Sequence, residues 1–237
     1  MSQYEVSGVG KAFNRGPIVI NAVQGVDLSI EPGQFVALEG PSGSGKTTLL
    51  QLLGALDRPS SGNVFFEGRN LAELRDGQLA EIRLRSFGFV FQQFNLIPTL
   101  TALENIQAKL APAGFSKVDS RDRAEALLAE VGLADRATHL PSHLSGGEQQ
   151  RVSIARALSV EPRVILADEP TGNLDSATGA EIIEMLASLA ANRSTTVIVA
   201  THDTGLAGRA ERRLAMRDGR LVGAEALTSA GTLATAT

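Results

Sequence analysis

The chain has no cysteine, few histidines and no long apolar run. Without cysteine it can form neither a disulfide nor a thiolate metal site, which fits a cytoplasmic protein. Its three histidines are too scattered for a histidine-rich metal centre. No stretch approaches the roughly 20 apolar residues that span a bilayer, and the N-terminus lacks the basic start and apolar core of a signal peptide. These absences predict a soluble cytoplasmic protein.

An excess of positive charge is also lacking. The formal net charge is −4, so no basic field indicates binding to nucleic acid. Hydrophobic residues make up 43% and charged residues 20% of the 237 residues, which is the composition of an ordinary globular protein. A chain of this length can form one large domain or a domain with an inserted lobe.

The most informative stretch, residues 40–47, reads G-x-x-x-x-G-K-T. It follows a short apolar run at 34–39 that predicts a buried strand, and it precedes a helical apolar pattern at 48–56. Between a strand and a helix, such a loop can direct backbone N–H groups and a helix N-terminus at a polyphosphate. The alternative, a glycine-rich turn with an exposed lysine, is less favoured in this context. We predict a nucleotide-binding loop made of Gly40, Pro41, Ser42, Gly43, Ser44, Gly45, Lys46, Thr47 and Thr48.

Two side chains of this loop suit the chemistry of a bound nucleotide. Lys46 can reach the β- and γ-phosphates, and the Thr47 hydroxyl suits a Mg²⁺ ligand. We therefore expect a triphosphate and Mg²⁺ together at this loop.

The rest of the pattern predicts an α/β fold. Short apolar stretches between Tyr4 and Ile30, broken by glycine, asparagine and proline, predict antiparallel strands and hairpins. Because later strands alternate with helices, the main sheet should be parallel, and the β-branched run at 195–200 is typical of a central strand buried on both faces. The expected strands lie at 64–68, 87–91, 164–167 and 195–200, and the expected helices at 71–85, 120–131, 145–158 and 179–191.

The middle of the chain, from about 95 to 158, contains no strand-like run. Thr101 and Glu104 have the spacing of a capping box at a helix start. We therefore predict a helical lobe inserted into an α/β core. The predicted division is one domain over 1–225, with the core and an antiparallel β subdomain at about 1–90 and 160–225, a helical subdomain at about 93–159, and a flexible tail at 226–237.

Two carboxylates follow the expected strand at 164–167. At the carboxyl end of a strand, Asp168 can hold Mg²⁺, directly or through water, beside the bound phosphates. Glu169 can orient and deprotonate an attacking water, a contribution of ~10²–10⁴-fold in rate. The alternative is that both acids cap the turn at Pro170, and the nearby nucleotide loop makes it the less favoured interpretation.

A second glycine-containing helix start lies at residues 144–149, which read LSGGEQ. Ser145 and Glu148 have capping-box spacing, so a purely structural account exists. Gly146 and Gly147 both lower helix stability, but they expose backbone N–H groups at the positive end of a helix dipole, where an anion is favoured. Because the first loop already holds one side of a triphosphate, we expect this helix start to contact nucleotide across an interface.

Taken in order with Gly172-Asn-Leu-Asp175 and His202, these motifs resemble those of the ATP-binding-cassette (ABC) ATPases over roughly residues 4–223. The resemblance implies a P-loop NTPase core with an antiparallel β edge subdomain and an inserted α-helical subdomain. It also implies ATP hydrolysis by a homodimer that forms in an ATP-dependent manner around two Mg-ATP.

The resemblance assigns further residues in the nucleotide site. Phe13 matches the aromatic residue that stacks on adenine, a position more often occupied by tyrosine; a core phenylalanine is the alternative. Gln92 matches the glutamine that contacts Mg²⁺ and couples the site to a membrane partner, with Gln93 beside it as the other candidate.

The remaining motif residues match contacts to the γ-phosphate and across the dimer. Ser145 and Gly147 match contacts to the γ-phosphate of the opposing subunit, and Asp175 matches a residue at the dimer interface. His202 matches the residue that touches the γ-phosphate. The one small departure is Glu148, where glutamine is commonest. It adds negative charge near the helix start, which favours capping but does not lie on the glycine N–H groups themselves, and we expect function to be intact.

Residues 89–106 and 167–176 are similar to the lipoprotein-release and macrolide-export group of ABC ATPases, which includes a cell-division ATPase. This similarity implies a separate integral membrane permease as partner and a position on the inner face of the cytoplasmic membrane. A soluble ABC ATPase of DNA repair or translation is the main alternative, but such proteins usually show two cassettes, a long coiled-coil insertion or a basic arm. A small-molecule kinase would leave residues 144–149 unexplained, and a scaffold that only binds nucleotide would leave Glu169 without a role.

Overall fold

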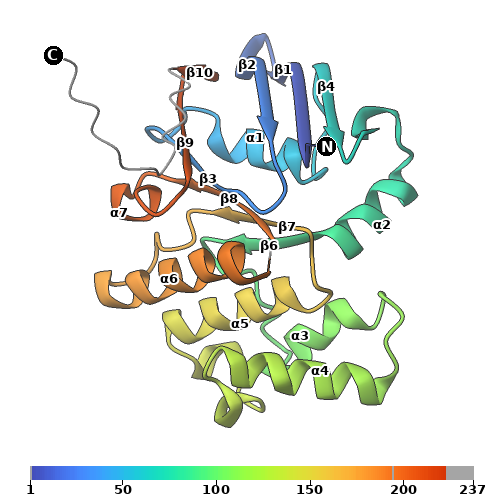
Figure 1. Cartoon of the computed structure of the whole chain (residues 1–237), viewed down its shortest axis with the longest axis vertical. Helices are drawn as coiled ribbons and strands as arrows, with labels where there is room; N and C mark the ends of the chain where they lie inside the picture. Colours follow the sequence, from blue (N-terminus) through green and yellow to red (C-terminus); the bar gives the residue numbers. More distant parts are fainter. Residues whose placement is uncertain (1, 194, 223–237) are drawn as a thin grey trace, which may run out of the picture.

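Two β-sheets form the framework of the chain (Figure 1). The computed structural model describes residues 2–193 and 195–222. The larger sheet has the strand order β10-β9-β3-β8-β7-β6. All neighbouring strands in it are parallel except β9 and β10, so the mainly parallel sheet predicted from the sequence is confirmed. Its strands are β3 Phe35–Glu39, β6 Phe87–Phe91, β7 Val164–Asp168, β8 Thr196–Thr201, β9 Arg212–Arg217 and β10 Arg220–Val222.

The carboxyl ends of four parallel strands meet at one edge of this sheet. Glu39 of β3 pairs with Thr201 of β8, and Asp168 of β7 pairs with Ala200 of β8 on one side and Phe91 of β6 on the other. The segments that follow β3, β6, β7 and β8 therefore emerge side by side. In open α/β sheets this edge is where ligands bind.

The smaller sheet is antiparallel, with the strand order β2-β1-β4-β5. Its strands are β1 Tyr4–Arg15, β2 Ile18–Ile30, β4 Ser61–Phe66 and β5 Arg69–Asn70. Helix α1 (Lys46–Leu53) packs between the two sheets, since Leu49 and Leu53 share one buried cluster with Val6 of β1 and Ile198 of β8. This arrangement confirms the antiparallel strands expected ahead of the glycine-rich loop.

Helices α3, α4, α5 and α6 lie on the other side of the large sheet (Figure 1). Strand β7 shows why two cores exist: Val164 and Leu166 join the cluster around α1, whereas Ile165 and Ala167 join the cluster of the four helices. Successive side chains of a strand point to opposite faces, so a sheet covered on both sides needs a continuous apolar run. The helices are α1 as above, α2 Asp76–Ser86, α3 Ala102–Leu110, α4 Lys117–Glu130, α5 Gly146–Leu158, α6 Ser176–Arg193 and α7 Thr204–Ala207, with short 3₁₀ helices η1 Leu71–Glu73, η2 Ala134–Arg136 and η3 Pro141–His143.

Several expected helices appear with different ends. Helix α4 starts earlier than the predicted 120–131, because Ser116 accepts a hydrogen bond from the backbone N–H of Asp119 and caps it. Helix α6 extends beyond the predicted 179–191 in both directions, and the stretch 71–85 is divided between η1 and α2. Element ends depend on caps that periodicity alone does not reveal.

Among the described residues, the segment between β6 and β7 contains only helices and turns, as an inserted helical lobe requires. Its first helix, α3, has the predicted capping box: Thr101 Oγ1 accepts from the N–H of Glu104 at 3.2 Å, and Glu104 Oε2 accepts from the N–H of Thr101 at 2.8 Å. The domain and lobe boundaries stay predictions, and the expected tail at 226–237 lies outside the described residues. Within residues 2–193 and 195–222, no helix has the length and apolar character needed to cross a bilayer.

Candidate nucleotide site

The glycine-rich loop leaves β3 and leads directly into α1. Gly40, Gly43 and Gly45 have φ angles of 152°, 78° and 105°, a region that side chains rarely adopt. A Cβ on Gly40 would lie 2.1 Å from the carbonyl oxygen of Met216, and a Cβ on Gly45 would lie 2.2 Å from that of Ala22. The loop is thus held between β9 and β2 at distances that only glycine permits.

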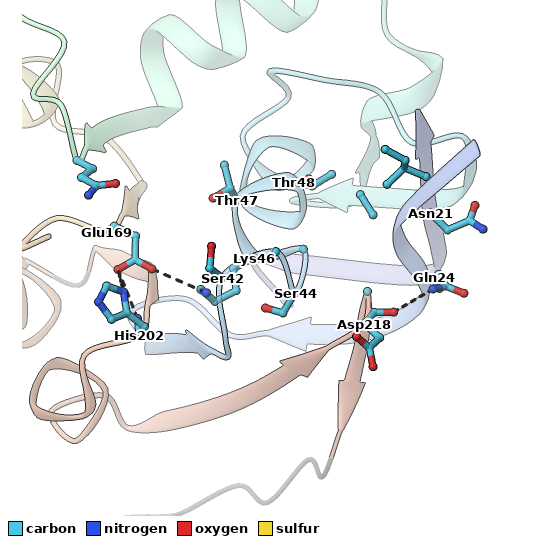
Figure 2. Close-up of a pocket in the computed structure, with 16 residues that line it drawn as sticks. Asn21, Gln24, Ser42, Ser44, Lys46, Thr47, Thr48, Glu169, His202 and Asp218 are labelled. Carbon is cyan, nitrogen blue, oxygen red and sulfur yellow. Dashed lines mark hydrogen bonds and ion pairs between the residues drawn. The ribbon is translucent and has the colours of Figure 1, made fainter. Parts of the chain in front are cut away.

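Lys46 is the first residue of α1, and its side chain is only 6% exposed. Its ammonium group donates to the carbonyl oxygens of Gly40 and Pro41, at 2.7 and 3.2 Å, and so lies across the loop. Nζ is also 3.8 Å from Oε1 of Glu169 (Figure 2). A buried cation facing a loop of backbone N–H groups is suited to a phosphate oxygen.

Thr47 and Asp168 are in direct contact, since Thr47 Oγ1 donates to Asp168 Oδ1 at 2.9 Å. Burial raises the pKa of Asp168 above its ordinary value, and the neighbouring charge of Glu169 acts in the same direction, while the bond from Thr47 and the charge of Lys46 oppose the shift. Like Thr47 and Lys46, a divalent cation beside Asp168 would favour the charged form of this carboxyl group.

The donor atoms here fit Mg²⁺ in a particular way. Thr47, Asp168 and Gln92 all offer oxygen, the ligand that Mg²⁺ prefers. Within residues 2–193 and 195–222, no group of three or more acidic, histidine or cysteine side chains could enclose a metal on its own. The site therefore fits an ion shared with substrate phosphates and water, which is how Mg²⁺ is usually held.

Glu169 and His202 form a close pair at the carboxyl ends of β7 and β8. His202 Nδ1 lies 2.8 Å from Glu169 Oε2 (Figure 2). Glu169 has a φ angle of 46°, which is strained for a residue with a side chain, and its N–H donates to Ala200 O at 2.8 Å. The glutamate side chain is 17% exposed and the histidine side chain is 69% exposed. The Glu169 carboxylate is therefore held in place at this edge of the sheet, and the His202 imidazole beside it is exposed to solvent.

Gln92, and not Gln93, lines the pocket that these residues share. Its Nε2 donates to Asn173 Oδ1 at 3.3 Å, and Asn173 Nδ2 donates to the carbonyl oxygen of Gln92 at 2.9 Å. A Cβ on Gly172 would lie 2.8 Å from Gln92 Nε2. The segment after β6 thus contacts the segment that follows Glu169.

The pocket has a volume of about 800 Å³ and brings ten of the predicted residues together (Figure 2), whereas Gly40, Pro41 and Asp168 are not part of its lining. Ser44 lines it with a buried Oγ that has no hydrogen-bond partner among the described residues, which suits an arriving phosphate oxygen. The predicted residues that line it are Ser42, Gly43, Ser44, Gly45, Lys46, Thr47, Thr48, Gln92, Glu169 and His202.

Sequence reasoning missed six residues of the lining, which are Ile20, Asn21, Ala22, Gln24, Asp218 and Gly219. Gln24 Nε2 donates to the carbonyl oxygen of Asp218 at 2.9 Å, so β2 and the turn between β9 and β10 form one wall. Asp218 and Gly219 have φ angles of 48° and 78°. Asp-Gly between Arg217 and Arg220 is a recognisable two-residue hairpin signal, but nothing local links it to this pocket.

Phe13 lies beside the pocket rather than in its lining. It pairs with Ile20 across the β1–β2 hairpin, so both side chains are on the same face of the smaller sheet, and Ile20 does line the pocket. The Phe13 ring is 40% exposed, with Lys11 Nζ 5.1 Å from its centroid. An exposed aromatic ring next to the pocket wall can stack on a base.

Ser145, Gly146 and Gly147 lie outside this pocket, at the start of α5. The capping box is present: Ser145 Oγ accepts from the N–H of Glu148 at 3.2 Å, and Glu148 Oε2 accepts from the N–H of Ser145 at 2.8 Å. Gly147 is buried, and a Cβ on it would lie 2.3 Å from Thr178 Cγ2. Gly147 therefore has a packing reason within the chain, in addition to the N–H group that it exposes, and the expected contact to nucleotide across an interface stays a prediction.

Asp175 also lies away from the pocket and caps α6. Its Oδ1 accepts from the N–H groups of Ala177 and Thr178 at 3.1 and 3.0 Å, and its Oδ2 accepts from the Thr178 hydroxyl at 2.8 Å. The pKa of Asp175 is lowered, mainly by the backbone hydrogen bond from Thr178. Thr178 therefore contacts both Asp175 and the Gly147 backbone.

A family model described as "ABC transporter" matches residues 23–172. The chain is 46% identical over 221 residues to an uncharacterized ABC transporter ATP-binding protein of Thermotoga maritima, and the match covers 93% of this chain and 94% of that protein. It is 47% identical to the lipoprotein-releasing system ATP-binding protein LolD of Syntrophus aciditrophicus, with 92% of this chain and 98% of LolD covered.

Other relatives are much longer than this chain. This chain is 48% identical over 217 residues to the macrolide export ATP-binding/permease protein MacB of Wolinella succinogenes. The match covers 92% of this chain but only 34% of MacB. Among solved structures, a dimeric post-hydrolysis state of the ATP-binding cassette MJ0796 bound to ADP and Pi has a TM-score of 0.89 and 43% identity, with 95% of this chain and 99% of MJ0796 covered.

Proposed function

Because the chain belongs to the ABC transporter family and is an ATPase cassette of that family, we propose that two copies close around two Mg-ATP and drive a separate membrane permease. The observation that carries the proposal is one pocket in which Lys46, Thr47 and Glu169 converge. A phosphate-binding loop, a cation ligand and a fixed carboxylate at one strand edge are the parts that hydrolysis of a triphosphate needs.

In the proposed reaction, Lys46 and His202 bind the γ-phosphate. Glu169 orients the attacking water and accepts its proton, a task supported by its short distance to His202 and by its restrained backbone. Thr47 and Gln92 would hold Mg²⁺, with Asp168 behind them. When bound, this ion neutralises negative charge on the phosphates.

The nucleotide base stacks on Phe13 in this proposal. Its exposed ring lies on the same face as Ile20, beside the pocket wall. Stacking needs only the π face of an aromatic ring, so phenylalanine serves as well as tyrosine.

A second copy would complete the site. Ser145, Gly146 and Gly147 lie outside the pocket of their own chain, which supports a contact to the γ-phosphate bound by the partner copy. Asp175, which fixes the start of α6, would lie at the interface between copies. The relative MJ0796 is described as dimeric with ADP and Pi, and the same arrangement is proposed for this chain.

The permease would bind in a groove of about 410 Å³ that is lined by residues of α2, β6, α3 and α5. Most of its lining is apolar, and the two cationic side chains in it are Lys109 and Arg156. Lys109 Nζ donates to the Phe87 carbonyl oxygen at 2.6 Å. Arg156 donates to the carbonyl oxygens of Phe94 and Asn95, which follow Gln92 closely in the chain. An amphipathic permease helix with a carboxylate on its apolar face matches this groove, whose apolar lining is Leu84, Phe89, Phe91, Ala108, Pro112 and Ala157.

The proposed division of labour assigns the permease contact to the helical subdomain at about 93–159 and the hydrolysis to the rest of a domain over 1–225. The position of the protein would be the inner face of the cytoplasmic membrane, through its permease. The names of the relatives LolD and MacB support lipoprotein release or macrolide export as the task of the permease, and force transmission without transport is the third alternative. No nucleic-acid partner is proposed.

The decisive variant is Glu169→Gln, which keeps the shape of the side chain and removes its basicity. It should bind Mg-ATP, stop phosphate release and accumulate as a dimer on size-exclusion chromatography with light scattering. A variant that stays monomeric in saturating Mg-ATP would contradict the two-copy proposal. The trapped dimer can then be mixed with detergent-solubilised native membranes to recover its partner. Recovery of ribosomes or repair proteins instead of a permease would favour a soluble ABC ATPase of translation or DNA repair over the transporter role.

A further inference from the structure

The start of α5 carries the negatively charged Glu148, although the proposed function requires this helix start to bind a phosphate. Both oxygens of Glu148 are engaged: Oε2 accepts from the N–H of Ser145 at 2.8 Å, and Oε1 accepts from Nε of Arg136 at 3.0 Å. The pKa of Glu148 is lowered, chiefly by the Ser145 backbone hydrogen bond and next by Arg136, so the group is a carboxylate. Its side chain is 20% exposed.

This carboxylate competes with the phosphate expected at the same helix start. In the proposed dimer, the N-terminus of α5 meets the γ-phosphate of the partner copy's ATP. Two anions near one helix N-terminus repel each other and share one source of favourable potential. A helix start with an uncompensated glutamate would therefore be a poor phosphate site.

Arg136 supplies the compensating charge from a different segment. It is the last residue of η2, twelve positions before Glu148, and its side chain remains 45% exposed while bonded to the carboxylate. The pair as a whole carries no net charge.

We infer that Arg136 is a positioning residue that neutralises Glu148 and so keeps the start of α5 able to bind the phosphate presented by a second copy. This inference rests on the proposed function, because it presupposes the dimer. It differs from a direct role of Arg136 on the phosphate, since here the arginine acts through Glu148.

The test uses the Glu169→Gln protein as parent, because its ATP-dependent dimer can be titrated. Arg136→Met removes the charge but keeps much of the apolar stem, and it should raise the Mg-ATP concentration for half-maximal dimer by about tenfold at low salt. The loss should shrink as NaCl is added, because salt screens exposed charges. Arg136→Lys, which keeps the charge, should remain near the parent.

The deciding measurement is rescue by a second substitution. Glu148→Gln can still accept the Ser145 N–H and carries no charge, so Arg136→Met combined with Glu148→Gln should return to within about threefold of the parent. Arg121→Met is the matched control, since Arg121 makes a comparable surface pair with Glu125 on α4, at 2.7 Å. It should leave dimer formation unchanged.

Three other outcomes are distinguishable. If the double variant is as weak as Arg136→Met, the arginine acts on the ligand or on shape rather than through Glu148. If Arg136→Met fails to fold, Glu148→Gln alone still decides: it should dimerise at an equal or lower Mg-ATP concentration, and weaker dimerisation contradicts the inference. If the parent itself forms no dimer, the proposed function fails, and that failure is recognisable before any Arg136 variant is made.

Discussion

Nε2 of Gln150 donates a hydrogen bond of 2.6 Å to the carbonyl oxygen of Pro170. Gln150 is fully buried on α5, and Pro170 directly follows Glu169, so α5 is tied to the residue next to the proposed base. On the other side, the N–H of Glu169 is held by Ala200 O. The strained backbone of the glutamate is therefore restrained at its own N–H and at the residue that follows it.

Replacing Gln150 by leucine should slow hydrolysis more than it weakens ATP binding. Without the amide donor, the Pro170 carbonyl is left buried and unpaired, and the Glu169 backbone can relax. We expect kcat to fall by about tenfold, with a change of less than about threefold in KM. Ser153→Ala is the control, because Ser153 is buried on the same helix and its Oγ has no partner within the described chain. A rise in KM with unchanged kcat would contradict the positioning role.

Substituting Gly147 by alanine should destabilise the fold, although alanine normally favours a helix. The added Cβ would lie 2.3 Å from Thr178 Cγ2, and overpacking of this kind costs ~1–3 kcal/mol. Thr178→Ser removes that methyl group and keeps the hydroxyl bonded to Asp175. In the Thr178→Ser background, Gly147→Ala should therefore cost nothing and can even stabilise, by up to ~1 kcal/mol. Urea midpoints of the four proteins test this, and an equal loss in both backgrounds would contradict the contact.

Site residues could be predicted from the sequence where they lie close together in the chain. Loop, lysine and threonine at 40–47 lie within one strand-to-helix turn, and Asp168 and Glu169 directly follow an apolar strand. Parallel pairing of β6, β7 and β8 then brings Gln92, Glu169 and His202 to one edge. That convergence could be expected because parallel strands end on the same side.

The wall formed by Asn21, Gln24 and Asp218 could not be predicted in the same way. Gln24 and Asp218 lie 194 positions apart, and their contact depends on how the smaller sheet is placed against β9 and β10. Similarly, the clash that requires glycine at 147 comes from Thr178 on the next helix along the large sheet. Such requirements arise from tertiary packing, which periodicity and spacing do not encode.

Phe13→Ala should weaken ATP binding without affecting binding of inorganic tripolyphosphate. Loss of stacking on the base costs ~1–3 kcal/mol, whereas tripolyphosphate has no base and uses only the loop. Lys11→Met should give a smaller loss of ~0.5–1 kcal/mol, because the ammonium group 5.1 Å from the ring centroid favours the ring position. Calorimetric titration with both ligands measures the difference. Phe115→Ala, at an equally exposed phenylalanine, is the control, and a parallel loss for both ligands at Phe13 would contradict base stacking.

His202→Ala should lower kcat by about 10²–10³-fold, since it removes both the proposed γ-phosphate contact and the partner of Glu169 Oε2. ATP affinity should change much less, because Lys46 and the loop remain. His143→Ala is the control, as His143 lies in η3 and does not line the pocket. Phosphate release and equilibrium ATP binding are measured on the same preparations. A loss in binding as large as the loss in kcat would show a ground-state role instead.

Because of Lys109, the free energy of unfolding should rise as the pH is raised from 8 to 10.5. Burial, and secondarily the charge of Arg156, lower the pKa of Lys109 from 10.5 to about 8. Between pH 8 and 10.5 the unfolded chain therefore binds more protons at this lysine than the native chain, so the free energy of unfolding rises with pH over that window. The neutral amine keeps N–H groups for the Phe87 carbonyl, and the bond at 2.6 Å survives deprotonation.

Relative to Lys109→Met, the wild-type protein should gain stability on the order of 2–3 kcal/mol at most across this window. Urea unfolding at pH 7.5, 8.5 and 9.5 measures the gain, with exposed Lys117→Met as the control that should show none. A difference between wild type and Lys109→Met that stays constant with pH would mean that this amine titrates alike in the folded and unfolded chain.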